Sequence, residues 1–165
     1  LGVVGIFAMI LHLISHSLSK GMLFLTSGNI FSAFGSKRYT DVKGLSKMMP
    51  VTGFLWLAGF FAITATPPFG LFISEFLIFK EMIAQSRYLT ALLTLIFVAV
   101  IFASMARIVI EMAFGADDTI KTKIHESAYM IAPPLVLLVI TFGLGVYIPE
   151  SVAVFINGIK EAFLK

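Results

Sequence analysis

The stretch that decides the fold is residues 2–31, GVVGIFAMILHLISHSLSKGMLFLTSGNIF. It is long enough to cross a membrane, since a transmembrane helix needs about 20 mainly apolar residues, and Lys20 is its only formally charged side chain. His12, His16 and Lys20 lie at i, i+4 and i+8, so a helix places all three on one face. Ionisable groups inside a membrane usually face a protein interior or a water-filled path. This row therefore predicts a proton relay.

The composition also indicates a membrane protein. The chain has 165 residues, of which 59% are hydrophobic and 13% charged, and its mean hydropathy is +1.00. Soluble domains have about 25% charged residues. The formal net charge of +3 comes without a basic stripe interleaved with aromatic residues, so it gives no support to nucleic-acid binding. The chain begins inside an apolar run, and we interpret it as part of a longer polytopic protein.

The chain has no cysteine, which excludes iron–sulfur ligation by thiolates, cysteine-bound zinc and disulfides. It has no nucleotide-binding motif either. We therefore expect no redox catalysis, no metal and no cofactor in this chain.

Four apolar segments are predicted, over about residues 2–31, 52–84, 89–114 and 129–148. Pro133 and Pro134 are expected in the first turn of the fourth segment, where proline is tolerated. The joints at 32–50 and 115–128 lie on the same side and together hold six Lys or Arg, whereas the other side holds only Arg87, Lys160 and Lys165. The positive-inside rule makes the joints cytoplasmic.

Residues 150–165 are predicted as an amphipathic tail, separate from a membrane domain over residues 1–149. The apolar residues at helical spacing in this tail are Val152, Phe155, Ile156, Ile159 and Phe163. Such a helix is expected to lie along the membrane surface.

A break is predicted inside the second segment, in residues 65–76, ATPPFGLFISEF. Pro67 and Pro68 each lack a backbone donor, so with Gly70 they interrupt the helix. Irregular backbone at membrane depth survives only where protein buries it or where it lines a polar cavity, and discontinuous helices build ion sites in transporters. Glu75 lies one to two turns beyond the break among apolar residues. It is a candidate for proton uptake and release.

Other interpretations of these four side chains exist. His12 and His16 could bind a metal or haem or simply hydrogen-bond between helices, although a lone H-x3-H pair is weak support for zinc. A lysine can snorkel to an interface, but Lys20 lies far from either end of its segment. Glu75 could be a buried carboxylate that stabilises the break.

Four further charged residues are weaker candidates for the ion path. Lys80 and Glu81 lie toward the end of the second segment, where snorkelling is the ordinary explanation. Arg107 and Glu111 stand four residues apart near the end of the third segment, where a local ion pair is the ordinary explanation.

Three motifs in this order resemble the antiporter-like membrane subunits shared by respiratory complex I, Mrp cation/proton antiporters and membrane-bound nickel–iron hydrogenases. They are H-x3-H-x3-K-x2-L-F-L over 12–25, DVKGLSKMMP over 41–50 and TPPFGLFISEF over 66–76. The resemblance implies an all-α membrane fold of about four transmembrane helices, the second discontinuous, forming the C-terminal part of a larger bundle. The S-E-F form of the third motif and GLGVYIP over 143–149 are most similar to the hydrogenase-4 branch.

The resemblance also implies roles for the ionisable residues. Lys20 would be the central channel lysine, His12 and His16 would link waters, and Glu75 would be the terminal ionisable residue. Many family members carry lysine at that last place, so Glu75 favours the hydrogenase-type and complex I-type subunits.

The function implied is that of a proton-translocating membrane-arm subunit of a redox-driven complex. The alternative is a subunit of an Mrp-type cation/proton antiporter without a redox partner, and a structural subunit that has lost transport is a third class. The implied partners are other membrane-arm subunits and, through them, a hydrogenase or quinone-reductase peripheral arm. The implied location is the inner (cytoplasmic) membrane.

Overall fold

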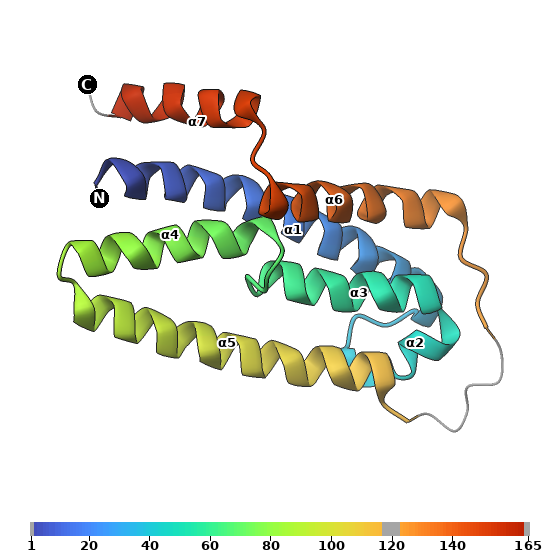
Figure 1. Cartoon of the computed structure of the whole chain (residues 1–165). Helices are drawn as coiled ribbons and strands as arrows, with labels where there is room; N and C mark the ends of the chain where they lie inside the picture. The colour runs from blue at the N-terminus through green and yellow to red at the C-terminus, as the bar shows by residue number, and fades with distance from the viewer. Residues whose placement is uncertain (1, 117–122, 164–165) are drawn as a thin grey trace.

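The chain is helical throughout the residues that the computed structural model describes, 2–116 and 123–163, apart from turns and joints. The elements are α1 (Val3–Phe34), η1 (Tyr39–Asp41), α2 (Leu45–Met48), α3 (Pro50–Ile63), α4 (Gly70–Ala84), α5 (Tyr88–Phe114), α6 (Ala128–Val146) and α7 (Glu150–Phe163). Figure 1 shows the long helices lying side by side, with α3 and α4 end to end between α1 and α5. The predicted all-α membrane fold is confirmed.

Among the described residues, three helices, α1, α5 and α6, are long and apolar enough to cross a membrane. They are the first, third and fourth predicted segments, with ends that differ by a few residues. The second segment is divided between α3, with 14 residues, and α4, with 15 residues. At about 1.5 Å per residue each is too short to cross about 30 Å of hydrocarbon alone. Together they make one discontinuous span.

The predicted break in the second segment is confirmed, because residues 64–69 lie outside both helices. Pro67 and Pro68 offer no N–H, and the Thr66 N–H instead turns back to the Phe61 carbonyl at 3.0 Å. The place of Gly70 differs from the prediction, since it is the first residue of α4 and not part of the break. A Cβ on Gly70 would lie 2.9 Å from Ser15 Oγ of α1, so this position needs glycine for close packing.

The start of α6 corrects a second prediction. Pro133 and Pro134 lie inside this helix and not in its first turn. Because Pro134 has no N–H, the Met130 carbonyl four residues earlier loses its helical partner. The Asn29 side-chain amide of α1 donates to that carbonyl at 2.8 Å. The helix can therefore begin earlier and still carry the two prolines.

The tail also differs from the prediction. α7 runs alongside the N-terminal half of α1 (Figure 1) and does not lie across the helix ends. The apolar contact between the two helices includes Ile10, Leu11, Val152, Ile156 and Ile159. Phe155, predicted for the same stripe, is 60% exposed, and the side chain of Phe163 lies outside the described part.

The C-terminal end of α6 touches the first break. Residues 147–149 separate α6 from α7, and Gly145 lies just before them. A Cβ on Gly145 would collide with the backbone of Pro68 and Phe69 in the first break. The absence of a side chain at Gly145 therefore lets the end of α6 pack against the first break.

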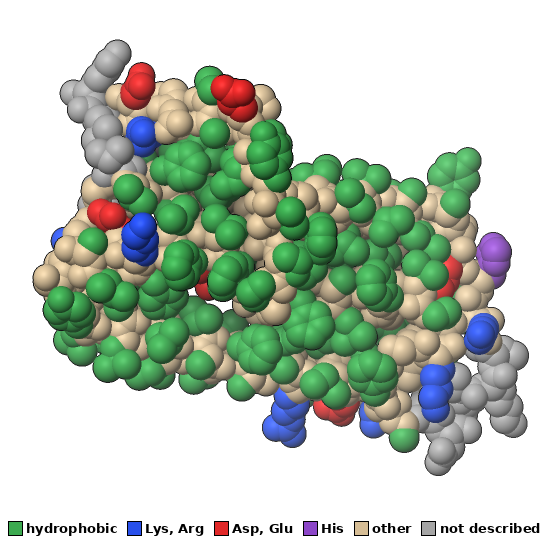
Figure 2. Space-filling model, in the orientation of Figure 1, with side chains coloured by type: hydrophobic (Ala, Val, Ile, Leu, Met, Phe, Trp, Pro, Cys, Tyr) green, Lys and Arg blue, Asp and Glu red, His purple; other side chains and the backbone are tan. Residues whose placement is uncertain are grey.

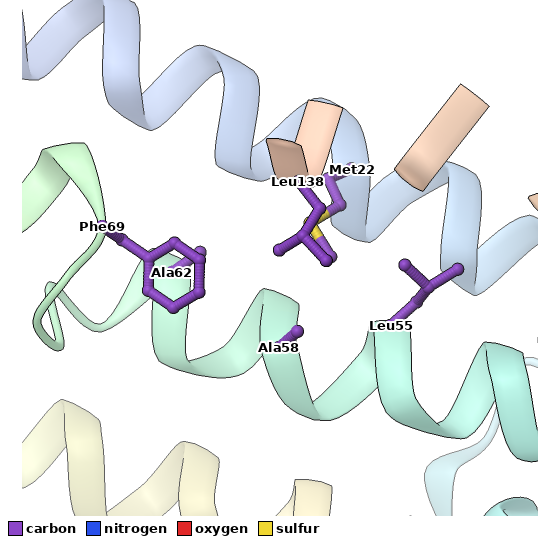
Figure 3. Packing of buried hydrophobic residues seen from close by; sticks show 6 residues of the cluster. All are labelled: Met22, Leu55, Ala58, Ala62, Phe69 and Leu138. Atoms are coloured by element: carbon purple, nitrogen blue, oxygen red, sulfur yellow. The ribbon is translucent and has the colours of Figure 1, made fainter. Parts of the chain in front are cut away.

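The apolar core beside the break lies where α1, α3 and α6 meet. Its buried residues are Met22, Leu55, Ala58, Ala62, Phe69 and Leu138. Figure 3 shows the Phe69 ring lying beside Ala62, while Met22 and Leu138 point toward α3. Phe69 thereby anchors the end of the break in the core.

The outer surface of the helices is largely apolar. Figure 2 shows hydrophobic side chains over most of one face, with Lys, Arg, Asp and Glu mainly along its edges. α5 presents exposed Leu92, Leu95, Ile96, Phe97, Val100 and Ile101. This distribution suits contact with lipid or with other membrane helices.

Candidate functional site

The four ionisable residues that the sequence singles out line one cavity of about 500 Å³. His12, His16 and Lys20 reach it from α1, and Glu75 reaches it from α4. The helical spacing predicts only that the first three share a face. The fold adds that Glu75 faces the same space, because the break redirects the chain so that α4 packs along α1.

The remaining cavity wall is mostly apolar and comes from α1, α3 and α5, with one residue from the break. It includes Trp56, Ile63, Thr64, Val98, Ile101, Phe102 and Met105. Thr64 is the first residue of the break, and its hydroxyl donates to the Phe60 carbonyl at 2.7 Å. The ionisable groups are therefore the main polar features of a largely apolar chamber.

Ser74 holds His12 in place across the α1–α4 interface. His12 Nδ1 lies 3.2 Å from Ser74 Oγ, and that hydroxyl donates its own proton to the Leu71 carbonyl at 2.8 Å. A serine hydroxyl has one proton to donate, so it presents a lone pair to His12. We assign the neutral imidazole a proton on Nδ1, which leaves Nε2 as the acceptor.

The two histidine rings are stacked one helical turn apart. Their centroids are 5.8 Å apart, with 17° between the ring planes. This arrangement suits a pair through which a proton passes.

Exposure differs among the four groups. His12, His16 and Glu75 are partly buried, whereas Lys20 is exposed at the rim of the cavity. The described residues show no ion pair within 4.0 Å between Lys20 and Glu75. The two groups thus share a chamber without forming the locked pair that would hold both of them charged.

The four weaker candidates lie elsewhere. Lys80, Glu81, Arg107 and Glu111 do not line this cavity, and Lys80 and Arg107 are exposed. The local ion pair suggested for Arg107 and Glu111 is not formed among the described residues. The structure therefore does not bring these residues together with the other four.

Two polar side chains at the site could not have been selected from the sequence. Ser74 stands directly before Glu75, which is the one available signal, and Trp56 lies in an apolar run that gives none. Across the described part of the chain, no cluster of three or more His, Cys, Asp or Glu could hold a metal ion. The metal-ligand interpretation of His12 and His16 thus gains no support.

Comparisons with known proteins identify the family of the chain. Residues 1–103 match the family described as NADH:quinone oxidoreductase/Mrp antiporter, transmembrane. A hydrogenase-4 component F homolog of Methylacidiphilum infernorum is 32% identical over 151 residues, covering 92% of this chain and 31% of the relative. One of the Na(+)/H(+) antiporter subunits of Bacillus subtilis is 27% identical over 166 residues, covering 94% of this chain and 34% of the relative.

A third relative comes from a chloroplast. NAD(P)H-quinone oxidoreductase subunit 5 of Chaetosphaeridium globosum is 31% identical over 159 residues, covering 84% of this chain and 23% of the relative. The chain thus spans between about a quarter and a third of the length of these curated relatives.

Proposed function

The chain belongs to the NADH:quinone oxidoreductase/Mrp antiporter family of membrane proteins, and from this premise we propose that it moves protons through the cavity between α1, α3, α4 and α5. The observation that carries the proposal is the common cavity of His12, His16, Lys20 and Glu75. Desolvating such groups is costly. Their convergence on one space beside a helix break is therefore best explained by transfer of charge.

The proposed transfer uses the side chains in spatial order. His12, fixed by Ser74, accepts a proton at Nε2 and exchanges it with His16, against which its ring is stacked. Lys20 is the loading site at the cavity rim, and Glu75 takes up or releases the proton from α4. Water links the groups in this proposal: the cavity of about 500 Å³ has room for several waters, since about 10–15 Å³ of such volume holds one, and the four ionisable groups supply the polar partners that water needs.

We further propose that the protein works as a membrane-arm subunit of a redox-driven complex. Glu75 within S-E-F supports this class over the cation/proton antiporters, as does similarity to a hydrogenase-4 component F homolog. Similarity to the Bacillus subtilis Na(+)/H(+) antiporter protein over 94% of the chain supports the alternative. Purification from native membranes separates the two, since hydrogenase or quinone-reductase subunits accompany only the first.

The proposed setting is the inner (cytoplasmic) membrane, with the 32–50 and 115–128 joints on the cytoplasmic side. The charges that support this orientation in the first joint are Lys37, Arg38, Lys43 and Lys47. The proposed partners are neighbouring membrane-arm subunits and the peripheral arm that they hold.

Lys20→Ala tests the proposal. In vesicles that contain the assembled complex, we expect this variant to abolish proton uptake while assembly is retained. Lys47→Ala removes the same charge from an exposed position on α2, outside the cavity, and serves as the control. Wild-type uptake by Lys20→Ala would refute the proposal.

A further inference from the structure

A second cavity, of about 470 Å³, continues from the first. Ser27 and Trp56 line both cavities. The second cavity also reaches the segment Ser36–Tyr39, which carries Lys37 and Arg38. The chain therefore places two hollows on either side of one serine and one tryptophan.

The order of the lining residues shows that the two hollows lie end to end. Along α1 the first cavity extends from His12 to Ser27, and the second from Ser27 to Phe31. α5 shows the same progression, from residues 98–105 in the first cavity to 108–112 in the second. The lining residues on both α1 and α5 therefore show that the second cavity extends from the first toward the charged joint.

The indole of Trp56 is the unusual group at the junction. Its Nε1 is buried and has no hydrogen-bond partner among the described residues. Buried indole N–H groups usually find a partner, because leaving one unpaired is costly. A water that enters between the two cavities, with a small rotation of the indole, would satisfy this donor.

Ser27 offers a second polar group for such a water. The hydroxyls of Ser19 and Thr26 on the same helix donate to carbonyls one turn back, at 2.9 and 2.8 Å. The Ser27 hydroxyl makes no bond of this kind within the described part, and the residue is exposed to the cavities. It is therefore available to hydrogen-bond with water at the junction.

The far end of the second cavity is polar and held in shape. Ser36 Oγ donates to Asp41 Oδ2 at 2.7 Å and accepts from the Arg38 N–H at 3.1 Å. Lys37 and Arg38 are exposed. The second cavity thus ends at a charged surface where protons can exchange with solvent.

We propose that Ser27 and Trp56 form the junction of a water-filled proton route that runs from the chamber of Lys20 and Glu75 to the membrane face carrying residues 36–39. The inference rests on the proposed function for the identity of the transported ion. At the junction a bridging water accepts a proton from one neighbouring water and passes one to the next. The Trp56 N–H donates a hydrogen bond that positions this water and keeps its own proton.

Thiol labelling tests the route without relying on transport. Residues 1–165 contain no cysteine, so Ser27→Cys introduces the only thiol in this part of the protein, and labelling is read on the peptide that contains residue 27. In the assembled complex in sealed vesicles, a small membrane-impermeant methanethiosulfonate should label this thiol from the face that carries residues 36–39, at least about tenfold faster than from the opposite face. Ser17→Cys is the control, since Ser17 is exposed on α1 but lines neither cavity. Labelling of Ser27→Cys only from the opposite face, or no faster than that of Ser17→Cys, would overturn the route.

Trp56→Phe tests the proton role of the junction. It keeps the ring but removes the N–H, and we expect proton uptake to fall about fivefold, the factor for one lost hydrogen bond. Tyr129→Phe, at a 92% exposed side chain, is the control. Wild-type uptake by Trp56→Phe would overturn the role of the indole, and if that variant fails to assemble, the labelling of Ser27→Cys still decides the route. The two failures can be told apart. If the proposed function is wrong but the route exists, Lys20→Ala retains wild-type uptake while the thiol of Ser27→Cys is still labelled from one face.

Discussion

Glu75 shows how one side chain gains its role from its surroundings. It faces a largely apolar cavity together with three basic groups, whereas Glu81, six residues later on the same helix, accepts a hydrogen bond from Gln85 at 2.7 Å near the helix end. Two carboxylates on one helix thus have different surroundings. Only the first is placed to exchange protons with the α1 row.

Glu75→Gln should therefore lower proton uptake strongly, by about tenfold or more, because an amide cannot carry the proton in exchange. Glu75→Lys should retain part of the uptake, since a lysine also binds and releases a proton. Glu81→Gln makes the same chemical change outside the cavity and should leave uptake unchanged. Uptake in reconstituted vesicles measures all three, and equal losses in Glu75→Gln and Glu81→Gln would contradict the assignment.

Ser74 gives a second prediction at the scale of residues. Ser74→Ala removes the acceptor for His12 Nδ1, and losing one such hydrogen bond corresponds to about 1 kcal/mol, or about a fivefold drop in uptake. Ser74→Thr keeps the hydroxyl and should restore most of the rate. Nitrogen NMR of labelled histidine in the assembled complex should show a changed tautomer ratio in Ser74→Ala. An unchanged ratio would show that Ser74 does not orient the ring.

Spacing along one helix could be used to predict the row His12, His16 and Lys20, because the α-helical period fixes which residues share a face. Ser74 and Trp56 could not be predicted in the same way. Their importance depends on which atoms face them from other helices. No sequence pattern around a serine or a tryptophan in an apolar segment indicates such a contact. The sequence specifies the row, and the fold supplies its surroundings.

Among the helices, too, some features could be predicted from the sequence and others depend on contacts between helices. Pro67 and Pro68 predict the break because proline removes donors wherever it stands. The same rule predicts that Pro133 and Pro134 stand in the first turn of α6, which is wrong. Asn29 of α1 donates to the Met130 carbonyl, so α6 begins earlier and continues through both prolines. The packing of α7 along α1 was missed for a similar reason. Its apolar stripe fits a neighbouring helix as well as it fits a membrane surface.

The contact between the end of α6 and the first break leads to a prediction for Gly145. Gly145→Ala should destabilise the protein by about 1–3 kcal/mol, the usual range for overpacking, because its Cβ would collide with the backbone of Pro68 and Phe69. Gly143→Ala is a matched control two residues away, where a Cβ would meet nothing within 4 Å. Thermal unfolding of the purified complex should show a lower midpoint for the first variant only. Equal midpoints would mean that the end of α6 does not pack against the break as described.

At the scale of the whole molecule, α3 and α6 are held together by hydrogen bonds near the predicted cytoplasmic face, in addition to the contact between the end of α6 and the break. The Glu126 carboxylate, just before α6, accepts the N–H groups of Val51 and Thr52 at 3.0 and 2.6 Å. These are donors in the first turn of α3, which have no partner within the helix. The Ile124 N–H also donates to the Met48 carbonyl at 3.0 Å. One carboxylate thereby fixes the start of α3 against the start of α6.

This joint supports a prediction that separates stability from transport. Glu126→Ala should lower stability by about 1–2 kcal/mol, since it removes a negative group and two hydrogen bonds from a helix N-terminus. Proton uptake per folded complex should stay near wild type, because Glu126 lines neither the first nor the second cavity. Glu161→Ala, at an exposed position on α7, is the control for loss of one carboxylate. Thermal unfolding and vesicle uptake measured on the same preparations check both parts. A strong loss of uptake at unchanged stability would place Glu126 on a proton path. The view that the cavity conducts protons while the Glu126 contact only holds the helices together would then be wrong.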